Sequence, residues 1–294
     1  MEFFDSHSHY NDEKFDEDRD EIIKQVYTLG ITSILCAGYN IKTSEKAIEL
    51  ASTYPHIYAS AGISPNDVED IETNKIDQVI ETIKNLAVEG KVVAIGEIGL
   101  DYYWNKENSK LQKEIFIKQI KVANELKLPI IIHTRESITD MIDILKNQVN
   151  CNKKGVFHCC PLNQELIKEA LKLDYYISFA GPITYKNSKN ADEIINMVPI
   201  EKILIETDCP YLSPEPKRGT RNDSRNIEYI ARKVAEVKQT NIEDIAKITY
   251  ENTKRLFNIW ITPKMLEKSL AFRGVFLSKC VEHCDEECLT ECDI

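Results

Sequence analysis

The sequence lacks the features of a membrane protein or a secreted one. None of its apolar runs approaches the roughly 20 residues that a membrane-spanning helix needs, and residues 1–5 hold neither a basic segment nor a long apolar one. A disulfide framework is also missing, because the nine cysteines are an odd number and Cys36, Cys159 and Cys160 stand in apolar, strand-like segments. We therefore expect a protein of the reducing cytoplasm.

Positive charge is scarce as well. The 294 residues include 37 lysines and arginines against 48 aspartates and glutamates, which gives a net charge of −11. This balance argues against a broad basic surface that wraps nucleic acid. Phosphate groups can still bind where metal ions or a local group of basic side chains reverse the field. A polyanion is therefore expected to bind only locally.

What the chain has instead is a regular alternation of strand-like and helix-like segments. Apolar, β-branched runs are typical of buried strands, and apolar residues at helical spacing follow each of them. The predicted strands cover residues 2–9, 31–37, 57–63, 92–98, 129–133, 155–159, 175–179 and 202–207. The predicted helices cover residues 16–29, 43–54, 74–86, 109–127, 138–148, 163–173, 191–198, 226–239 and 242–257.

Eight strands, each followed by a helix, predict an α/β fold, namely a (β/α)8 TIM barrel with a short C-terminal extension. The nearly continuous hydrophobicity of the strands fits a parallel sheet buried on both faces. A doubly wound open sheet is the alternative, but such sheets more often have fewer strands, and no Gly-x-Gly-x-x-Gly turn follows the first strand. We expect one barrel domain over residues 1–260 and a tail over residues 261–294.

The tail differs from the barrel in composition. It ends in an acidic stretch in which cysteines recur at every fourth position, as Cys280, Cys284, Cys288 and Cys292. On a straight helix the outer two cysteines would lie about 18 Å apart, too far for four thiolates to surround one ion. Cysteine pairs across a dimer, a bent tail, a redox-sensitive appendage and a mobile tail with free thiols all stay open.

Side chains that commonly bind metals end the predicted strands. His7 and His9 end the first strand, Glu97 the fourth, His133 the fifth, His158 the sixth and Asp208 the eighth. In a barrel these strand ends form one rim, where catalytic residues gather. Four imidazoles and two carboxylates suffice for two divalent ions, a set that suits displacement at phosphorus or at a carbonyl. Each residue taken alone could equally be a core histidine or a helix-capping acid.

A carboxylate beside such ions can accept the proton of an attacking water. Asp208 is the candidate for this role because it ends the closing strand, opposite His133 on the fifth.

Basic and aromatic residues occupy the loops of the same rim. The basic ones include Arg135 after the fifth strand and Lys217, Arg218 and Arg221 after the eighth. Guanidinium groups match phosphate oxygens, so these residues are candidate substrate contacts, and incidental charge in a solvated loop is the alternative. The aromatic residues, Tyr103 and Trp104 among them, either stack on unpaired bases or fill the barrel mouth.

Five short stretches carry a more specific signal. They are Asp5-Ser6-His7-Ser8-His9, Gly96-Glu97-Ile98-Gly99-Leu100-Asp101-Tyr102, Pro129 through His133-Thr134-Arg135, Gly155-Val156-Phe157-His158-Cys159, and Glu206-Thr207-Asp208-Cys209-Pro210-Tyr211. Together they resemble the TatD-type deoxyribonucleases, which belong to the amidohydrolase superfamily of barrel metal enzymes. The motifs follow the family's order and spacing from residue 2 to about residue 260. This resemblance implies a divalent-metal hydrolase that cuts phosphodiesters, often as a 3′ exonuclease on single-stranded DNA.

The resemblance also implies a role for each matching residue. One metal would be held by His7, His9, Glu97 and Asp208, and the second by Glu97, His133 and His158, with Glu97 as the bridge. Two stretches depart from the family pattern. In Gly62-Ile63-Ser64-Pro65 a serine stands where the family usually has a histidine facing the phosphate, and Cys159-Cys160-Pro161-Leu162 replaces the usual Cys-Phe-Ser-Gly. Ser64 can donate a hydrogen bond to substrate but carries no charge.

The expected function is thus metal-dependent hydrolysis of phosphodiester bonds by a 3′ exodeoxyribonuclease that uses water activated by two divalent ions, Mg, Mn or Zn. We expect a monomer that binds single-stranded DNA and no membrane. A metal-dependent hydrolase of a small ester, lactone or amide is one alternative. A metal-binding or nucleic-acid-binding protein without catalysis is another. The sequence does not determine which metal is used, whether the substrate is DNA or RNA, or which end of the strand is attacked.

Overall fold

The computed structural model describes residues 1–259. The expectations for the tail, including its four regularly spaced cysteines, lie outside these described residues.

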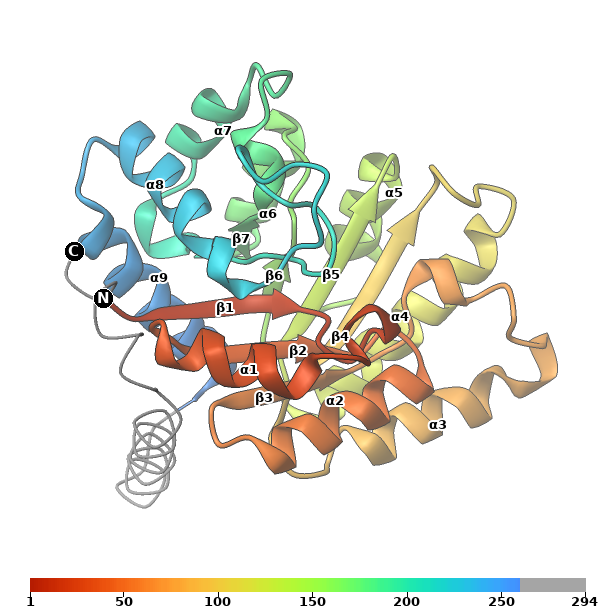
Figure 1. The fold of residues 1–294 in the computed structure, drawn as a ribbon. Helices are drawn as coiled ribbons and strands as arrows, with labels where there is room; N and C mark the ends of the chain where they lie inside the picture. The colour runs from red at the N-terminus through yellow and green to blue at the C-terminus, as the bar shows by residue number, and fades with distance from the viewer. Residues whose placement is uncertain (260–294) are drawn as a thin grey trace. The chain divides into compact units, whose positions relative to one another are not determined.

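Eight parallel strands form one sheet in sequence order (Figure 1). They are β1 (Phe3–Ser8), β2 (Ile31–Ala37), β3 (Ile57–Ala61), β4 (Val92–Asp101), β5 (Ile130–Arg135), β6 (Gly155–Phe157), β7 (Tyr176–Phe179) and β8 (Ile203–Ile205). The segment after β8 closes the ring on β1, because the Asp208 amide donates to the His7 carbonyl (3.0 Å) and the His9 amide to the Cys209 carbonyl (2.7 Å). The predicted (β/α)8 barrel is confirmed, and the open sheet is excluded.

Helices alternate with the strands and surround them (Figure 1). They are α1 (Arg19–Thr28), α2 (Ile41–Thr53), α3 (Ile76–Leu86), α4 (Ser109–Leu126), α5 (Ile138–Asp143), α6 (Gln164–Lys172), α7 (Ala191–Met197), α8 (Ile227–Lys238) and α9 (Ile242–Phe257). Among residues 1–259, none of these helices is both long and apolar enough to cross a membrane.

Local sequence signals account for several helix ends. The Asn40 side chain accepts the Thr43 amide (2.9 Å) at the start of α2, and Asn241 accepts the Asp244 amide (2.7 Å) at the start of α9. An asparagine at this position satisfies a backbone N–H that the helix itself leaves unpaired. At the other end of α9, Asn258 adopts the left-handed conformation (φ 53°) in which helices commonly stop.

The barrel interior is apolar toward the N-terminal ends of the strands. One buried cluster draws side chains from every strand and from the end of α9: Phe4, Leu35, Ala37, Tyr58, Ala94, Ile131, Val156, Tyr176, Leu204, Phe257 and Ile259. Because residues two apart point to the same face of a strand, His133 follows Ile131 and His158 follows Val156 into the interior. The apolar cluster therefore forms a floor beneath the polar residues at the C-terminal mouth.

Most strand ends at the mouth differ from the sequence prediction. β5 runs to Arg135, so His133 lies inside the strand, whereas β1 stops at Ser8 and β6 at Phe157, so His9 and His158 lie just beyond their strands. β4 continues to Asp101, paired with Arg135 of β5, so Glu97 lies inside the strand and the prediction that it ends β4 is wrong. β8 stops at Ile205, so Asp208 lies in the following loop with a positive φ of 55°. The hydrogen bonds of this loop to β1 place Asp208 back over the barrel mouth.

Candidate metal centre

The six predicted ligands converge at the C-terminal mouth of the barrel. All of their side chains are largely buried, and their donor atoms face one another. Two groups of three have donor atoms within 4.8 Å of each other: His7 with Glu97 and His158, and His7 with His9 and Asp208. Elements that are far apart in the chain thus deliver nitrogen and oxygen donors to one small volume.

Glu97 occupies the middle of this arrangement. Its Oε2 lies 3.4 Å from His7 Nε2 and 3.7 Å from His9 Nε2. Its Oε1 lies 3.2 Å from His133 Nδ1 and 3.6 Å from His158 Nε2. One carboxylate oxygen is therefore directed toward each pair of histidines, as a bridging ligand requires.

Asp208 completes the side of the site formed by β1. Its Oδ1 lies 3.2 Å from His9 Nε2 and 3.6 Å from His7 Nε2. Burial would raise the pKa of Asp208, but the hydrogen bond from His9 and the charges of the neighbouring histidines hold it below its ordinary value. Asp208 is therefore ionised at neutral pH and able to act as a ligand or as a base.

The same balance acts at Glu97 and His158. Burial would raise the pKa of Glu97, yet the charge of His158 and hydrogen bonds from His133, His158 and His7 lower it well below its ordinary value. Burial would lower the pKa of His158, but the charge of Glu97 and a hydrogen bond with Glu206 raise it well above. Buried carboxylates that stay ionised beside imidazoles are suited to a divalent cation.

Three histidines are held by acceptors on their outer nitrogens. His133 Nε2 lies 2.9 Å from Asp101 Oδ2, and His158 Nδ1 lies 3.4 Å from Glu206 Oε1. His9 Nδ1 lies 3.1 Å from the Ala37 carbonyl. The hydrogen bonds of His133 and His9 fix the orientation of these two rings and turn the other nitrogen toward the site, whereas His158 Nδ1 has only the longer electrostatic contact with Glu206. Together with the ionised carboxylates, this donor set fits divalent metal ions.

Asp101 and Glu206 were missed by the sequence analysis as part of the site. Both residues are fully buried, with an exposed fraction of 0%. A signal was available, because both acids stand in otherwise apolar segments close to a predicted ligand. Buried acids of this kind need a partner, and the sequence alone does not say which histidine provides it.

A cavity of about 770 Å³ opens above the six ligands. Of the predicted substrate contacts, Ser64 and Arg135 line it. Ser64 precedes the short 3-10 helix η2 (Pro65–Asp67), and its hydroxyl lies 3.4 Å from Glu97 Oε1. A serine hydroxyl here is within reach of the metal centre itself.

The other three predicted contacts do not line this cavity. Arg221 donates to Asp18 Oδ1 (2.9 Å) and to the Lys14 carbonyl (2.7 Å) and so ties its loop to the start of α1. The Arg218 guanidinium lies 4.2 Å from the centre of the Tyr185 ring. Lys217 is exposed in the same loop.

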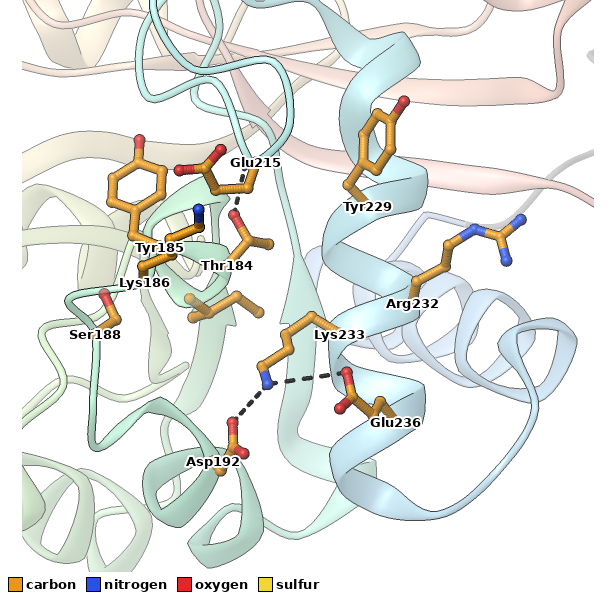
Figure 2. A pocket seen from close by; sticks show the side chains of 11 residues that line it. Thr184, Tyr185, Lys186, Ser188, Asp192, Glu215, Tyr229, Arg232, Lys233 and Glu236 are labelled. Carbon is orange, nitrogen blue, oxygen red and sulfur yellow. Dashed lines mark hydrogen bonds and ion pairs between the residues drawn. The ribbon is translucent and has the colours of Figure 1, made fainter.

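Tyr185 belongs to a second cavity of about 430 Å³, shown in Figure 2. One side of this cavity is formed by the 3-10 helix η5 (Gly181–Thr184) and the residues that follow it, and the other side by α8. Lys186 and Arg232 contribute to its lining. Lys233 is held there by Asp192 at 2.7 Å (Figure 2). Ile183 lines both cavities, so η5 is the wall between them.

A parallel eight-stranded barrel with buried histidines and carboxylates at its C-terminal mouth has the architecture of a metal-dependent hydrolase. The chain belongs to the TatD related DNase family, whose model matches residues 4–258. The family resemblance drawn from the motifs is therefore confirmed, and the chain is a metal-dependent hydrolase of that family.

Individual relatives agree with this placement. The chain is 41% identical over 256 residues to the uncharacterized metal-dependent hydrolase YabD of Bacillus subtilis, covering 87% of this chain and 99% of the relative. It is 31% identical over 251 residues to the 3'-5' ssDNA/RNA exonuclease TatD of Escherichia fergusonii, covering 84% and 95%. The crystal structure of YjjV, a TatD homolog from Escherichia coli, superposes with a TM-score of 0.82 at 25% identity and covers 88% and 98%.

Proposed function

We propose that the chain removes nucleotides from the 3′ end of single-stranded DNA by hydrolysing phosphodiester bonds at two divalent ions. The observation that carries this proposal is the position of Glu97, whose two oxygens face separate pairs of histidines. His7, His9, Glu97 and Asp208 would hold one ion, and Glu97, His133 and His158 the other. Divalent ions in such positions supply hydroxide near neutral pH and neutralise charge on the phosphate.

The protein's own residues would then position substrate and move the proton. Asp208, kept ionised by its histidine neighbours, would accept the proton of the attacking water. The Ser64 hydroxyl would donate to a phosphate oxygen, and Arg135 at the cavity wall would place a positive charge near the strand. A relative named as an exonuclease on single-stranded DNA and RNA supports a polynucleotide as substrate.

The composition of the cavity wall favours a second candidate as well. Apolar residues make up much of the wall, including Trp104, Leu162, Pro182, Ile183 and Leu212, while Arg135 is the one lysine or arginine in it among the described residues. A small ester, lactone or amide would also fit such a wall with the same metal ligands.

One experiment separates the two candidates. Single strands labelled at the 3′ or the 5′ end are incubated with the protein and Mg²⁺, Mn²⁺ or Zn²⁺ in turn, beside the Asp208→Asn variant. We expect stepwise loss of nucleotides from the 3′ end, slower by roughly 10²-fold or more in the variant, since a general base typically contributes that much. Intact strands with every metal, together with rapid hydrolysis of a small ester, would favour the second candidate.

A further inference from the structure

Trp104 and Tyr103 stand exposed at the rim of the metal cavity. A third exposed aromatic side chain, Tyr211, also lines the cavity, but its hydroxyl donates to Asp12 Oδ2 (2.7 Å). Trp104 is 68% exposed and Tyr103 is 49% exposed, whereas most other large apolar side chains of residues 1–259 are buried. Both residues lie in the loop between β4 and α4, and Trp104 lines the cavity that contains the metal centre. An exposed aromatic surface that continues into a catalytic cavity is characteristic of a binding site.

Arg135 joins these rings into one surface. Its guanidinium carbon lies 3.7 Å from the centre of the Tyr103 ring and 5.5 Å from that of Trp104. The two rings meet edge to face, with centres 4.8 Å apart at 88°. Within residues 1–259, Arg135 forms no ion pair with an acidic side chain, so its charge remains available beside the rings. We call Tyr103, Trp104 and Arg135 the aromatic platform.

The aromatic platform is fixed to the metal centre by Asp101. Oδ1 of this carboxylate accepts the backbone N–H groups of Tyr103 (2.9 Å) and Trp104 (3.2 Å), while Oδ2 faces His133 Nε2 (2.9 Å). On the other side, the Tyr102 amide donates to the Arg135 carbonyl (2.9 Å), and β4 and β5 lie side by side (Figure 1). The distance from the rings to the predicted ligand His133 is therefore set by rigid elements rather than by a free loop.

We propose that the aromatic platform binds one unpaired nucleobase of the substrate strand, with Trp104 as the stacking surface. The inference rests on the proposed nuclease function and adds to it a recognition site for the base. Every nucleobase presents a flat face to an aromatic ring, whereas in a duplex these faces are covered by neighbouring base pairs. The adjacent guanidinium adds attraction for the base and for the backbone phosphate without reading the sequence. The platform thus selects single strands, and it does so independently of sequence.

The test measures binding of fluorescent, hydrolysis-resistant phosphorothioate single strands to the metal-loaded protein. In one strand series each nucleotide in turn is replaced by an abasic unit. We expect Trp104→Ala to weaken binding of the intact strand roughly tenfold, and Trp104→Phe to retain most of the affinity, because stacking on one base has about that worth and tolerates any aromatic ring. For the wild type, an abasic unit at one position should weaken binding by the same factor as Trp104→Ala does on the intact strand. On the strand with that abasic unit, wild type and Trp104→Ala should bind with equal affinity.

Leu29→Ala serves as the matched control, because Leu29 is 63% exposed at the end of α1. The proposal would be overturned if wild type and Trp104→Ala bound the strand with equal affinity, or if the wild type did not bind it. It would also be overturned if the affinity lost through Trp104→Ala and the affinity lost through the abasic unit added fully at every position of that unit. Cleavage of ordinary strands is measured separately. If cleavage persists while the platform fails, only the recognition site is wrong, and if no strand is cut, the nuclease function falls with it.

Discussion

At the scale of single residues, Asp101 connects the metal centre to the loop that carries Trp104. One of its oxygens faces His133 and the other holds two backbone amides. A carboxylate in this position makes the imidazole a stronger donor to a cation and fixes its orientation.

We predict that Asp101→Asn weakens affinity for a divalent metal by about 10- to 100-fold, since losses of this size follow when the group that orients a metal-binding histidine is removed. Asparagine preserves the shape of the side chain, removes its charge and replaces one acceptor oxygen by an amide donor. Competition with a metal-binding dye measures the affinity. Asp77→Asn is the control, because Asp77 pairs at the surface with Lys118 at 2.7 Å. An unchanged affinity in Asp101→Asn would show that Asp101 does not support His133.

The residues whose metal-binding chemistry is evident from their type could be predicted from the sequence. The residues whose role depends on a distant partner could not. The structure places all six predicted ligands at one mouth. Arg221 was predicted to contact substrate, but it pairs with Asp18, which is 203 positions away in the sequence. A contact between such distant residues cannot be predicted from a local sequence pattern. Asp101 and Glu206 were missed although both are acids in apolar segments, because only the fold determines which histidine each of them faces.

At the scale of elements, the close approach of β4 and β5 depends on Gly99. Its φ is +148°, and an added Cβ would lie 1.9 Å from the His133 carbonyl oxygen. A side chain at this point would push β5, and His133 with it, away from Glu97.

Gly99→Ala is therefore predicted to lower the free energy of unfolding by about 2–4 kcal/mol, from strain and overpacking together, and to weaken metal binding. Gly219→Ala is a suitable control, because Gly219 also has a positive φ (+86°) and nothing lies within 4 Å of its added Cβ. It should cost about 1 kcal/mol and leave metal binding unchanged. Urea unfolding and metal titration measure both. Equal effects of the two variants would mean that strand separation is not set at Gly99.

The burial of His56, in the turn before β3, makes the free energy of unfolding depend on pH. It is buried and its ring stacks on Tyr27 of α1 with centres 4.3 Å apart. Burial and the charge of Lys91 lower the pKa of His56 to about 3. The unfolded chain therefore binds more protons than the folded one between about pH 6.5 and pH 3, so stability falls as the pH drops through this window.

At pH 5 this contribution should amount to about 2 kcal/mol relative to pH 7.5, from the two pKa values alone. We predict that His56→Gln lacks this part of the acid sensitivity. Urea unfolding of the metal-free protein at both pH values measures the difference between wild type and variant. The same loss in both proteins would indicate that His56 is protonated in the fold.

Most element types were predictable because their periodicities differ so clearly, and α9 matches its prediction at both ends. The ends near the site were less predictable. β4 runs three residues beyond its predicted end, from Ile98 to Asp101, because pairing with β5 extends it. The segment predicted as one helix over residues 138–148 is α5 followed by a π-helix, Ile144–Gln148. Such changes depend on tertiary contacts rather than on local pattern.

Considering the entire chain, a net charge of −11 means that the proposed DNA substrate would be attracted only by local groups of positive charge. Lys217 and Arg218 supply exposed positive charge, and Arg218 lies against Tyr185 of the second cavity, while Arg221 is already paired with Asp18.

We predict that Lys217→Ala with Arg218→Ala slows cutting of DNA strands at low salt by roughly tenfold and reduces its salt dependence, since each phosphate contact contributes to the salt slope. Hydrolysis of a small phosphodiester should stay unchanged. Arg221→Ala should instead lower stability and have little effect on the salt slope. Equal losses on strands and on the small substrate would contradict a role for these two side chains in attracting the strand.

In the proposed centre Glu97 would lie between two metal ions held by four histidines and Asp208. Anomalous diffraction from crystals soaked in Mn²⁺ would locate these ions. We predict two peaks, one beside His9 and Asp208 and the other beside His133 and His158, with Glu97 between them. A single peak on one side of Glu97, or peaks away from these side chains, would contradict the account.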